Sequence, residues 1–155
     1  MAKILIVEDN ALNIKLFCDL LAAHGHEPEA ITDSRLALEA ARSFEPDLVI
    51  TDIQLPHVSG LDLIRQIRDD KALAEIPIMA VTAYSATGDE ERIRAAGAQA
   101  YVSKPISVMK FAQTVDELLE DASERELEKT GTEDLANEGG DGPGLGEAGG
   151  EEDPI

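Results

Sequence analysis

The chain has 155 residues and a formal net charge of −19, with 43% hydrophobic and 3% aromatic residues. Nucleic acids and anionic membranes bind proteins through basic patches, so this charge argues against both as partners. The single cysteine, Cys18, excludes an internal disulfide and suits a reducing compartment. No apolar run reaches the ~20 residues of a membrane span, and the N-terminus lacks a signal-peptide layout. A cytoplasmic protein is therefore expected.

Apolar runs and helical spacings alternate along the first 120 residues. Short apolar runs predict five strands. These strands are expected at residues 3–7, 27–31, 48–51, 77–81 and 101–102. Apolar residues that recur at helical spacing, often behind a capping residue such as Asp33, Ser34 or Ser107, predict five helices. These helices are expected at residues 10–24, 34–43, 60–67, 89–96 and 107–119.

This alternation predicts an α/β fold in which five strand–helix units form a doubly wound parallel sheet. Right-handed crossovers leave few topologies for such a chain. The strand order 2-1-3-4-5, as in flavodoxin-like folds, fits best. Pro28 supports this order, because a proline cannot donate to a central ladder and therefore marks strand 27–31 as an edge.

The composition changes after about residue 122. Residues 1–120 hold 20 acidic and 11 basic side chains, a net charge of −9, whereas residues 121–155 hold 12 and 2, a net charge of −10. Eight of the chain's 12 glycines also lie between Gly131 and Gly150. Such a segment cannot bury enough apolar surface to offset its ordering entropy. We therefore expect one domain at residues 1–122 and a disordered acidic tail at 123–155, with the last helix able to extend toward Lys129.

Polar residues follow four of the five predicted strands. Glu8 and Asp9 follow the first strand, Asp52 the third, Thr82 the fourth and Lys104 the fifth. Because the carboxyl ends of parallel strands meet at one edge, we expect these side chains to converge. Three close carboxylates repel one another unless a cation neutralises them, which favours Mg²⁺ or alternatively Mn²⁺. Lys104 and Thr82 suit a phosphoryl group, so Asp52 is a candidate phosphoryl-accepting nucleophile.

Other phosphate-binding motifs are not found. The turn after the first strand, Glu8-Asp9-Asn10, is acidic rather than glycine-rich. This excludes an ordinary dinucleotide site and a P-loop. No serine–histidine or cysteine–histidine arrangement is apparent, and we expect His57, in the loop after Asp52, to be exposed and incidental.

Over about residues 3–120 the chain resembles the receiver domains of two-component response regulators, the CheY-like superfamily. The motifs that carry the resemblance are Ile6-Val7-Glu8-Asp9-Asn10, Asp52 with Leu55-Pro56 and Gly60, Val81-Thr82-Ala83, and Lys104-Pro105. Each motif alone is weak, but together they are highly specific. The resemblance implies that Asp52 accepts a phosphoryl group in a Mg²⁺-dependent reaction.

The resemblance also implies roles for the metal ligands. Asp9 and Asp52 would bind Mg²⁺ directly, Glu8 would act through water, and Gln54 would contribute its backbone carbonyl. No further cofactor is implied.

Other residues would transmit the signal. Lys104 would contact the phosphoryl group, and the Lys104–Pro105 peptide would be cis. Thr82 and Tyr101 would form a switch pair. A histidine kinase or a histidine phosphotransfer protein would donate the phosphoryl group. A downstream protein would bind the face formed by helix 89–96, strand 101–102 and the helix after Ser107.

Four segments are similar to the DivK-type single-domain response regulators of the α-proteobacterial cell cycle. They are residues 7–17, 52–56, 88–94 and 103–107. The similarity implies a role in cell-cycle or polarity control. The acidic tail is longer than that subfamily implies, which leaves the choice of partner open.

Two other functions stay open at the level of sequence. The first is a Mg²⁺-dependent phosphohydrolase with an aspartate nucleophile. Such enzymes usually carry a second aspartate two residues later as general acid, where this chain has Gln54, which is a poor proton donor. The second is an adaptor that works without phosphorylation and binds its partner through the acidic tail. We favour a phosphoacceptor that is not an enzyme, with slow loss of its own phosphoryl group.

Overall fold

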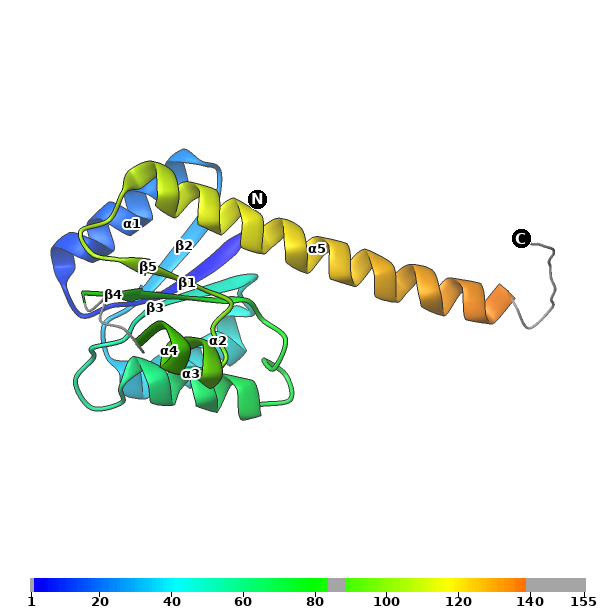
Figure 1. Ribbon diagram of the computed structural model, residues 1–155, viewed down its shortest axis with the longest axis horizontal. Coiled ribbons are helices and arrows are strands. Elements are labelled where there is room, and N and C mark those ends of the chain that lie inside the picture. Colours follow the sequence, from blue (N-terminus) through cyan, green and yellow to red (C-terminus); the bar gives the residue numbers. More distant parts are fainter. Residues whose placement is uncertain (1, 84–88, 139–155) are drawn as a thin grey trace. The chain divides into compact units, whose positions relative to one another are not determined.

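The computed structural model describes residues 2–83 and 89–138 (Figure 1). The strands are β1 (Lys3–Val7), β2 (Glu27–Ile31), β3 (Leu48–Asp52), β4 (Ile78–Thr82) and β5 (Ala100–Ser103). The helices are α1 (Ala11–Ala23), a 3₁₀ turn η1 (Ser34–Leu36), α2 (Ala37–Phe44), α3 (Gly60–Asp69), α4 (Asp89–Ala96) and α5 (Val108–Glu138). Each predicted strand and helix is therefore present, and all except α5 lie close to their expected bounds.

All strands pair in parallel in the order β2-β1-β3-β4-β5, which confirms the predicted fold class and topology. Strands β3 and β4 are buried along their whole length, which explains why their sequences are continuous apolar runs. Strand β2 lies at the edge and is only partly buried. Pro28 is therefore placed where its missing N–H group costs little.

Helices cover both faces of the sheet (Figure 1), and each face has its own apolar core. On one face, α1 and α5 contribute Phe17 and Phe111, whose rings stack with centroids 5.1 Å apart. On the other face, α2, α3 and α4 contribute residues such as Ala41, Ile64 and Ile93. Successive strand residues alternate between the two cores. The sheet is thereby held rigidly enough to fix the positions of residues at its carboxyl edge.

One predicted cap differs from the structure. Asp33 and Ser34 were candidate caps for the second helix, but the Asp33 side chain accepts from Arg35 N and caps η1 instead. An aspartate that bonds a backbone N–H two residues later favours a tight turn over an α-helical start. Helix α2 follows this turn, and Leu36 at its start provides no side-chain cap.

The end of α5 also differs from the prediction. The last helix was expected to be able to extend toward Lys129 before a disordered tail, and α5 continues beyond that residue to Glu138. The stretch from Glu124 to Lys129 contains mainly glutamate, leucine, arginine and lysine, which are strong helix formers. The rest of the predicted tail, residues 139–155, lies outside the described residues. None of the helices in the described ranges combines the length and hydropathy that a membrane crossing requires.

Arg68, near the end of α3, joins two connecting segments. Its guanidinium donates to four acceptors: the carbonyl oxygens of Ala74, Ile76 and Gly97 and the side-chain oxygen of Gln99. Ala74 and Ile76 lie before β4, whereas Gly97 and Gln99 lie between α4 and β5. One charged side chain thus ties the loops that enter two neighbouring strands.

We predict that Arg68→Ala lowers the free energy of unfolding by about 2–4 kcal/mol, because partly buried carbonyl groups lose a charged donor. The matched control is Arg65→Ala on the same helix, where the exposed pair with Asp62 is lost. That control is expected to cost less than ~0.5 kcal/mol. Urea unfolding measures both variants, and an equal loss in the two would contradict the role of Arg68.

Candidate functional site

The carboxyl ends of β1, β3, β4 and β5 lie along one edge of the sheet. Glu8 directly follows β1, Asp52 ends β3, Thr82 ends β4, and Lys104 directly follows β5. The strand registers place these positions beside one another, because Val7 pairs with Thr51, Asp52 with Val81 and Thr82 with Ser103. The predicted convergence of strand-end residues is therefore present.

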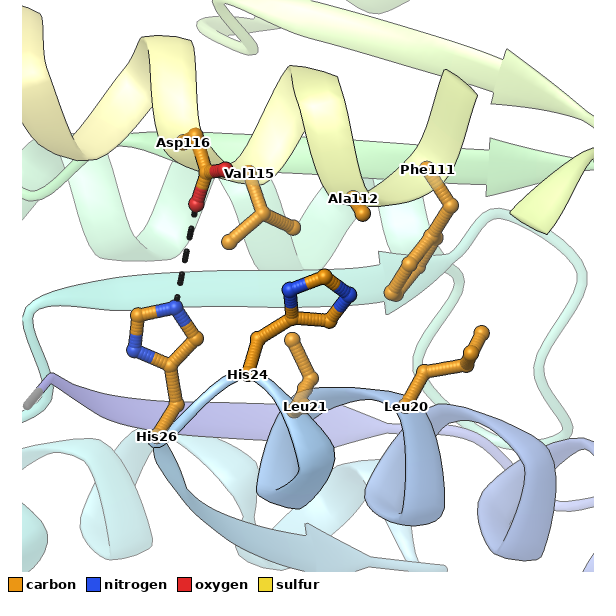
Figure 2. A pocket seen from close by; sticks show the side chains of 8 residues that line it. All are labelled: Leu20, Leu21, His24, His26, Phe111, Ala112, Val115 and Asp116. Atoms are coloured by element: carbon orange, nitrogen blue, oxygen red, sulfur yellow. Dashed lines mark ion pairs between the residues drawn. The ribbon is translucent and has the colours of Figure 1, made fainter. Parts of the chain in front are cut away.

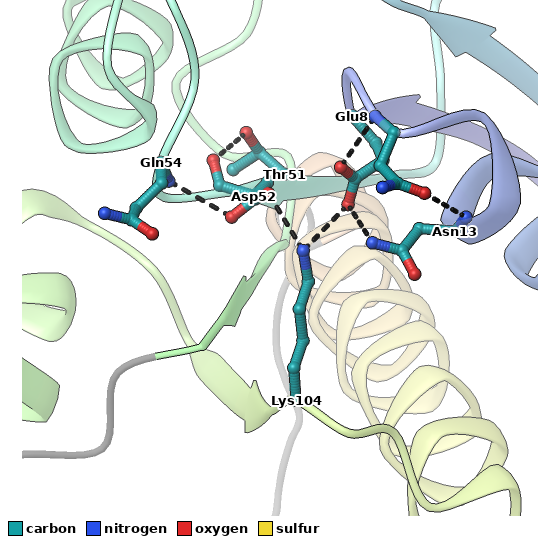
Figure 3. Close-up of polar contacts among 7 residues, drawn as sticks. Glu8, Asn13, Thr51, Asp52, Gln54 and Lys104 are labelled. Atoms are coloured by element: carbon teal, nitrogen blue, oxygen red, sulfur yellow. Dashed lines mark hydrogen bonds and ion pairs between the residues drawn. The ribbon is translucent and has the colours of Figure 1, made fainter.

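Asp52 lies at the centre of the polar network in Figure 3. The residue is only 6% exposed. Its Oδ2 accepts a hydrogen bond from Lys104 Nζ at 2.9 Å, and its Oδ1 accepts from Gln54 N at 3.1 Å. The Lys104 contact also makes an ion pair. Both carboxylate oxygens thus have donors, and the carboxylate is held in one orientation.

Glu8 is buried beside Asp52 and shares the same lysine. Its Oε1 accepts from Lys104 Nζ at 3.2 Å, and its Oε2 accepts from Asn10 N at 3.1 Å. Burial raises the pKa of Glu8, the hydrogen bond from Asn10 opposes this, and the negative charge of Asp52 raises the pKa further. Burial alone would lower the pKa of Lys104, but the hydrogen bond and charge of Asp52, together with Glu8, raise it. Lys104 therefore stays charged and bridges the two carboxylates.

Asp9 completes a cluster of three carboxylates. One oxygen from each of Glu8, Asp9 and Asp52 lies within 4.8 Å of the others, and Asp9 is exposed while the other two are buried. When all three are ionised they carry three negative charges, and Lys104 supplies one positive charge. The remaining two negative charges match one divalent cation. Oxygen ligands around an exposed corner suit a hard ion that keeps part of its water shell, so the cluster could hold a metal.

Thr82 and Tyr101 lie on neighbouring strands and on the same face of the sheet. Thr82 is buried, and its carbonyl oxygen accepts from Lys104 N at 2.7 Å. Tyr101 pairs with Ala80, two residues before Thr82, and packs against the core beneath α2, α3 and α4. The Lys104–Pro105 peptide bond is cis, as the resemblance implied.

Two residues of the site were not assigned a role from the sequence. Asn13 Nδ2 donates to Glu8 Oε1 at 3.5 Å from the first turn of α1 (Figure 3). Its position three residues after the helix cap Asn10 could have indicated this, because the first turn faces back toward the strand end. Gly60 begins α3 against Asp52, and a Cβ at residue 60 would overlap the Asp52 carbonyl oxygen. The sequence pattern marked Gly60 without showing this close approach.

A separate shallow pocket lies between α1 and α5 (Figure 2). It is lined by apolar residues of both helices, with His26 Nε2 lying 3.9 Å from Asp116 Oδ1 at one side. His24 and His26 follow the C-terminal end of α1, whereas the carboxylate cluster lies at its N-terminal end. The pocket therefore takes no part in the carboxylate site.

Comparison with known proteins gives one consistent family. The model of the response regulator receiver domain matches residues 4–116. The polar-differentiation response regulator DivK of Brucella ovis is 51% identical over 119 residues, which cover 77% of this chain and 97% of that protein.

Solved structures with a similar fold support the same family. The chemotaxis protein CheY4 of Vibrio cholerae has a TM-score of 0.72 and 25% identity, and the match covers 76% of this chain and 98% of that chain. The receiver domain of the sensor histidine kinase PA1611 from Pseudomonas aeruginosa has a TM-score of 0.71 and 28% identity, covering 76% and 97%. That crystal structure has a magnesium ion coordinated in the active site cleft.

We predict that Glu8→Gln stabilises the protein in EDTA at neutral pH. Because the folded-state pKa of Glu8 is raised, folding favours the protonated form. The wild type therefore loses stability as pH rises from the ordinary glutamate pKa through the raised one. The glutamine variant lacks this loss, so the difference should be present at about pH 7.5 and vanish at about pH 4.

Urea unfolding at the two pH values measures this difference. Glu117→Gln, an exposed substitution on α5, is the control and should change little at either pH. A Glu8→Gln variant that is less stable than the wild type at neutral pH in EDTA would contradict the prediction, since the Lys104 ion pair would then outweigh the cost of burial.

Proposed function

This chain belongs to the family of response regulator receiver domains, and we propose on that premise that Asp52 accepts a phosphoryl group. The observation that carries the proposal is the arrangement at Asp52. One buried carboxylate has a lysine on one oxygen, a backbone N–H on the other, and two further carboxylates beside it. This arrangement supplies a carboxylate nucleophile, a lysine that can contact phosphate oxygens, and further carboxylates that can hold a cation.

In the proposed step, a carboxylate oxygen of Asp52 attacks the phosphorus atom of a phosphohistidine. An oxygen–phosphorus bond forms while the phosphorus–nitrogen bond breaks, and the electron pair leaves with the imidazole nitrogen. The chemistry consists mainly of positioning and charge neutralisation. Lys104, 2.9 Å from Asp52 Oδ2, can turn toward the incoming phosphoryl oxygens without leaving the site.

The cluster Glu8, Asp9 and Asp52 fits a divalent cation, and we propose Mg²⁺, or Mn²⁺ as a substitute. Asp9 and Asp52 would bind it directly, Glu8 through water and Gln54 through its backbone carbonyl. When bound, the ion neutralises charge on the carboxylates and on the phosphoryl group. The excess of two negative charges in the metal-free cluster supports this assignment.

Thr82 and Tyr101 are the proposed switch pair. Phosphorylation would draw the Thr82 hydroxyl toward the new phosphoryl group, and Tyr101 would turn on the same face of the sheet. The parallel pairing of β4 and β5 supports this coupling, because Tyr101 on β5 pairs with the β4 residue that lies two positions before Thr82. The surface of α4, β5 and α5 would then bind a downstream protein with changed affinity.

The donor is proposed to be a histidine kinase or a histidine phosphotransfer protein of the cytoplasm. Because the relative from Brucella ovis is named a polar-differentiation response regulator, we extend cell-cycle or polarity control to this chain. The acidic balance of the sequence argues against output through DNA, RNA or a membrane surface. The domain boundary at about residue 122, with an acidic segment after it, belongs to the same proposal.

Phosphohydrolase activity is the less favoured alternative. Gln54 directs its backbone N–H to Asp52, and its side chain cannot act as a general acid. The phosphoryl group would therefore be stored, with slow self-catalysed hydrolysis, rather than turned over.

We predict that acetyl phosphate with Mg²⁺ adds one phosphoryl group to the wild type and none to Asp52→Asn. EDTA should abolish the addition, because the carboxylate cluster then stays uncompensated. Intact-protein mass spectrometry measures the product. Asp62→Asn, an exposed carboxylate on α3, is the matched control and should be phosphorylated like the wild type. Equal phosphorylation of the Asp52→Asn variant would refute the proposal.

We predict that removal of residues 139–155 leaves the rate of phosphotransfer from a phosphorylated cognate histidine kinase within about twofold of the full chain, because the proposed chemistry uses residues 8–104 only. Partner binding should still depend on Asp52 in the truncated protein. If binding is lost on truncation and is unaffected by Asp52→Asn, the phosphorylation-independent adaptor is the correct function.

A further inference from the structure

Ser34 is a buried polar residue outside the strand-end cluster. It begins η1, in the connection between β2 and α2, and is 3% exposed. A buried hydroxyl is costly unless both its donor and acceptor functions are used. Here Ser34 Oγ donates to the Pro56 carbonyl oxygen at 2.7 Å and accepts from Val58 N at 3.1 Å. Its partners therefore lie in the loop that follows Asp52.

Pro56 and Val58 lie on either side of a residue whose backbone conformation is rare for residues other than glycine. His57, between Pro56 and Val58, has a φ of 72° and is exposed. A left-handed conformation at a residue other than glycine persists only where its surroundings hold it in place. Ser34 supplies this support, because its single oxygen atom bonds the peptide groups on both sides of His57.

Both ends of this loop are attached to the phosphoacceptor. At the start, Gln54 N donates to Asp52 Oδ1. At the end, Gly60 N donates to the Ile53 carbonyl oxygen at 2.9 Å, and Gly60 lies directly against Asp52. The middle of the 53–59 loop packs Leu55 and Val58 against the core. Apolar contacts of this kind are not directional, so the orientation of the peptide groups depends on the directional bonds of Ser34.

The backbone is stiff between Gln54 and the Pro56 carbonyl group, which accepts the hydrogen bond from Ser34. Pro56 has a fixed φ, and the residue before a proline, Leu55, is restricted to extended conformations. Only two residues separate the peptide group held by Ser34 from the carbonyl group of Gln54. Apart from ψ of Pro56, few free torsions lie between the two groups, so a displacement of the Pro56 peptide group is passed largely to Gln54.

We propose that Ser34 is a positioning residue, whose hydroxyl orients the 53–59 loop so that the Gln54 carbonyl is in place for the divalent cation. The inference rests on the proposed function, since it takes the Gln54 carbonyl as a metal ligand. Ser34 itself touches neither the metal ligands nor the reacting atoms. It acts through two backbone bonds from a segment that lies about 20 residues before Asp52 in the chain.

The test compares Mg²⁺ binding by Ser34→Ala, Ser34→Thr and Ser59→Ala, followed through the backbone amide signals of Asp9 and Gln54 in an NMR titration with MgCl₂. Ser34→Ala should raise the dissociation constant about tenfold, as is typical when support of a metal ligand is lost. Ser34→Thr keeps the hydroxyl and should stay within about twofold. Ser59→Ala removes a hydroxyl of the same loop that caps α3 through Asp62 N. It should lower the Tm but leave the dissociation constant within about twofold.

Amide exchange gives a second readout in EDTA, where metal binding plays no part. The Val58 N–H should exchange faster in Ser34→Ala than in the wild type. Its exchange rate in Ser59→Ala should equal that of the wild type. If Ser34→Ala does not fold, Ser34→Cys, which offers a weaker hydrogen-bonding group of similar size, should show the same two effects.

The outcomes separate this inference from the proposed function. A wild type that binds Mg²⁺ and a Ser34→Ala variant with unchanged affinity would overturn the role of Ser34 and leave the proposed function standing. Equal losses of affinity in Ser34→Ala and Ser59→Ala would also overturn it, because general loosening of the loop would then explain both. A wild type that binds no Mg²⁺ would overturn the metal assignment and the inference together.

Discussion

The repulsion between the buried carboxylates of Glu8 and Asp52 is the constraint on which the rest of the site depends. Burial and mutual charge both favour protonation of Glu8, and Lys104 offsets this cost by bonding both carboxylates. With Asp9 ionised beside them, the lysine alone cannot balance the charge. The excess of negative charge favours binding of a divalent cation.

The fold supplies the rigidity that such a site requires. Asp52 ends a strand that is buried along its whole length. Glu8 follows the adjacent strand β1, and Lys104 follows β5, on the other side of β4. Gly60 lets α3 approach the Asp52 carbonyl oxygen more closely than any side chain would permit. Ser34 holds the loop between these two points. Keeping like charges close together thus lowers local stability, and it serves the proposed function rather than folding.

The sequence predicted the sheet and the strand-end cluster well, for clear physical reasons. Buried parallel strands have continuous apolar runs, Pro28 marks an edge, and parallel strands bring their carboxyl ends together. The contacts of Arg68 and Ser34 could not be predicted, because each joins segments about 6–30 residues apart whose approach depends on the finished fold. The end of α5 was harder to predict. The helix formers up to Lys129 indicated an extension of the last helix, but the glycines and acidic residues after residue 130 gave no sign that it reaches Glu138.

We propose that Asp52, and no other carboxylate of the cluster, carries the phosphoryl group in a Mg²⁺-dependent reaction. The most direct measurement is borohydride reduction of the phosphorylated protein, which converts an acyl phosphate of aspartate to homoserine, followed by peptide mass spectrometry. Homoserine is expected at position 52 alone, formed with Mg²⁺ and absent with EDTA. Homoserine at position 9, or an equal yield at position 52 without the metal, would contradict this proposal.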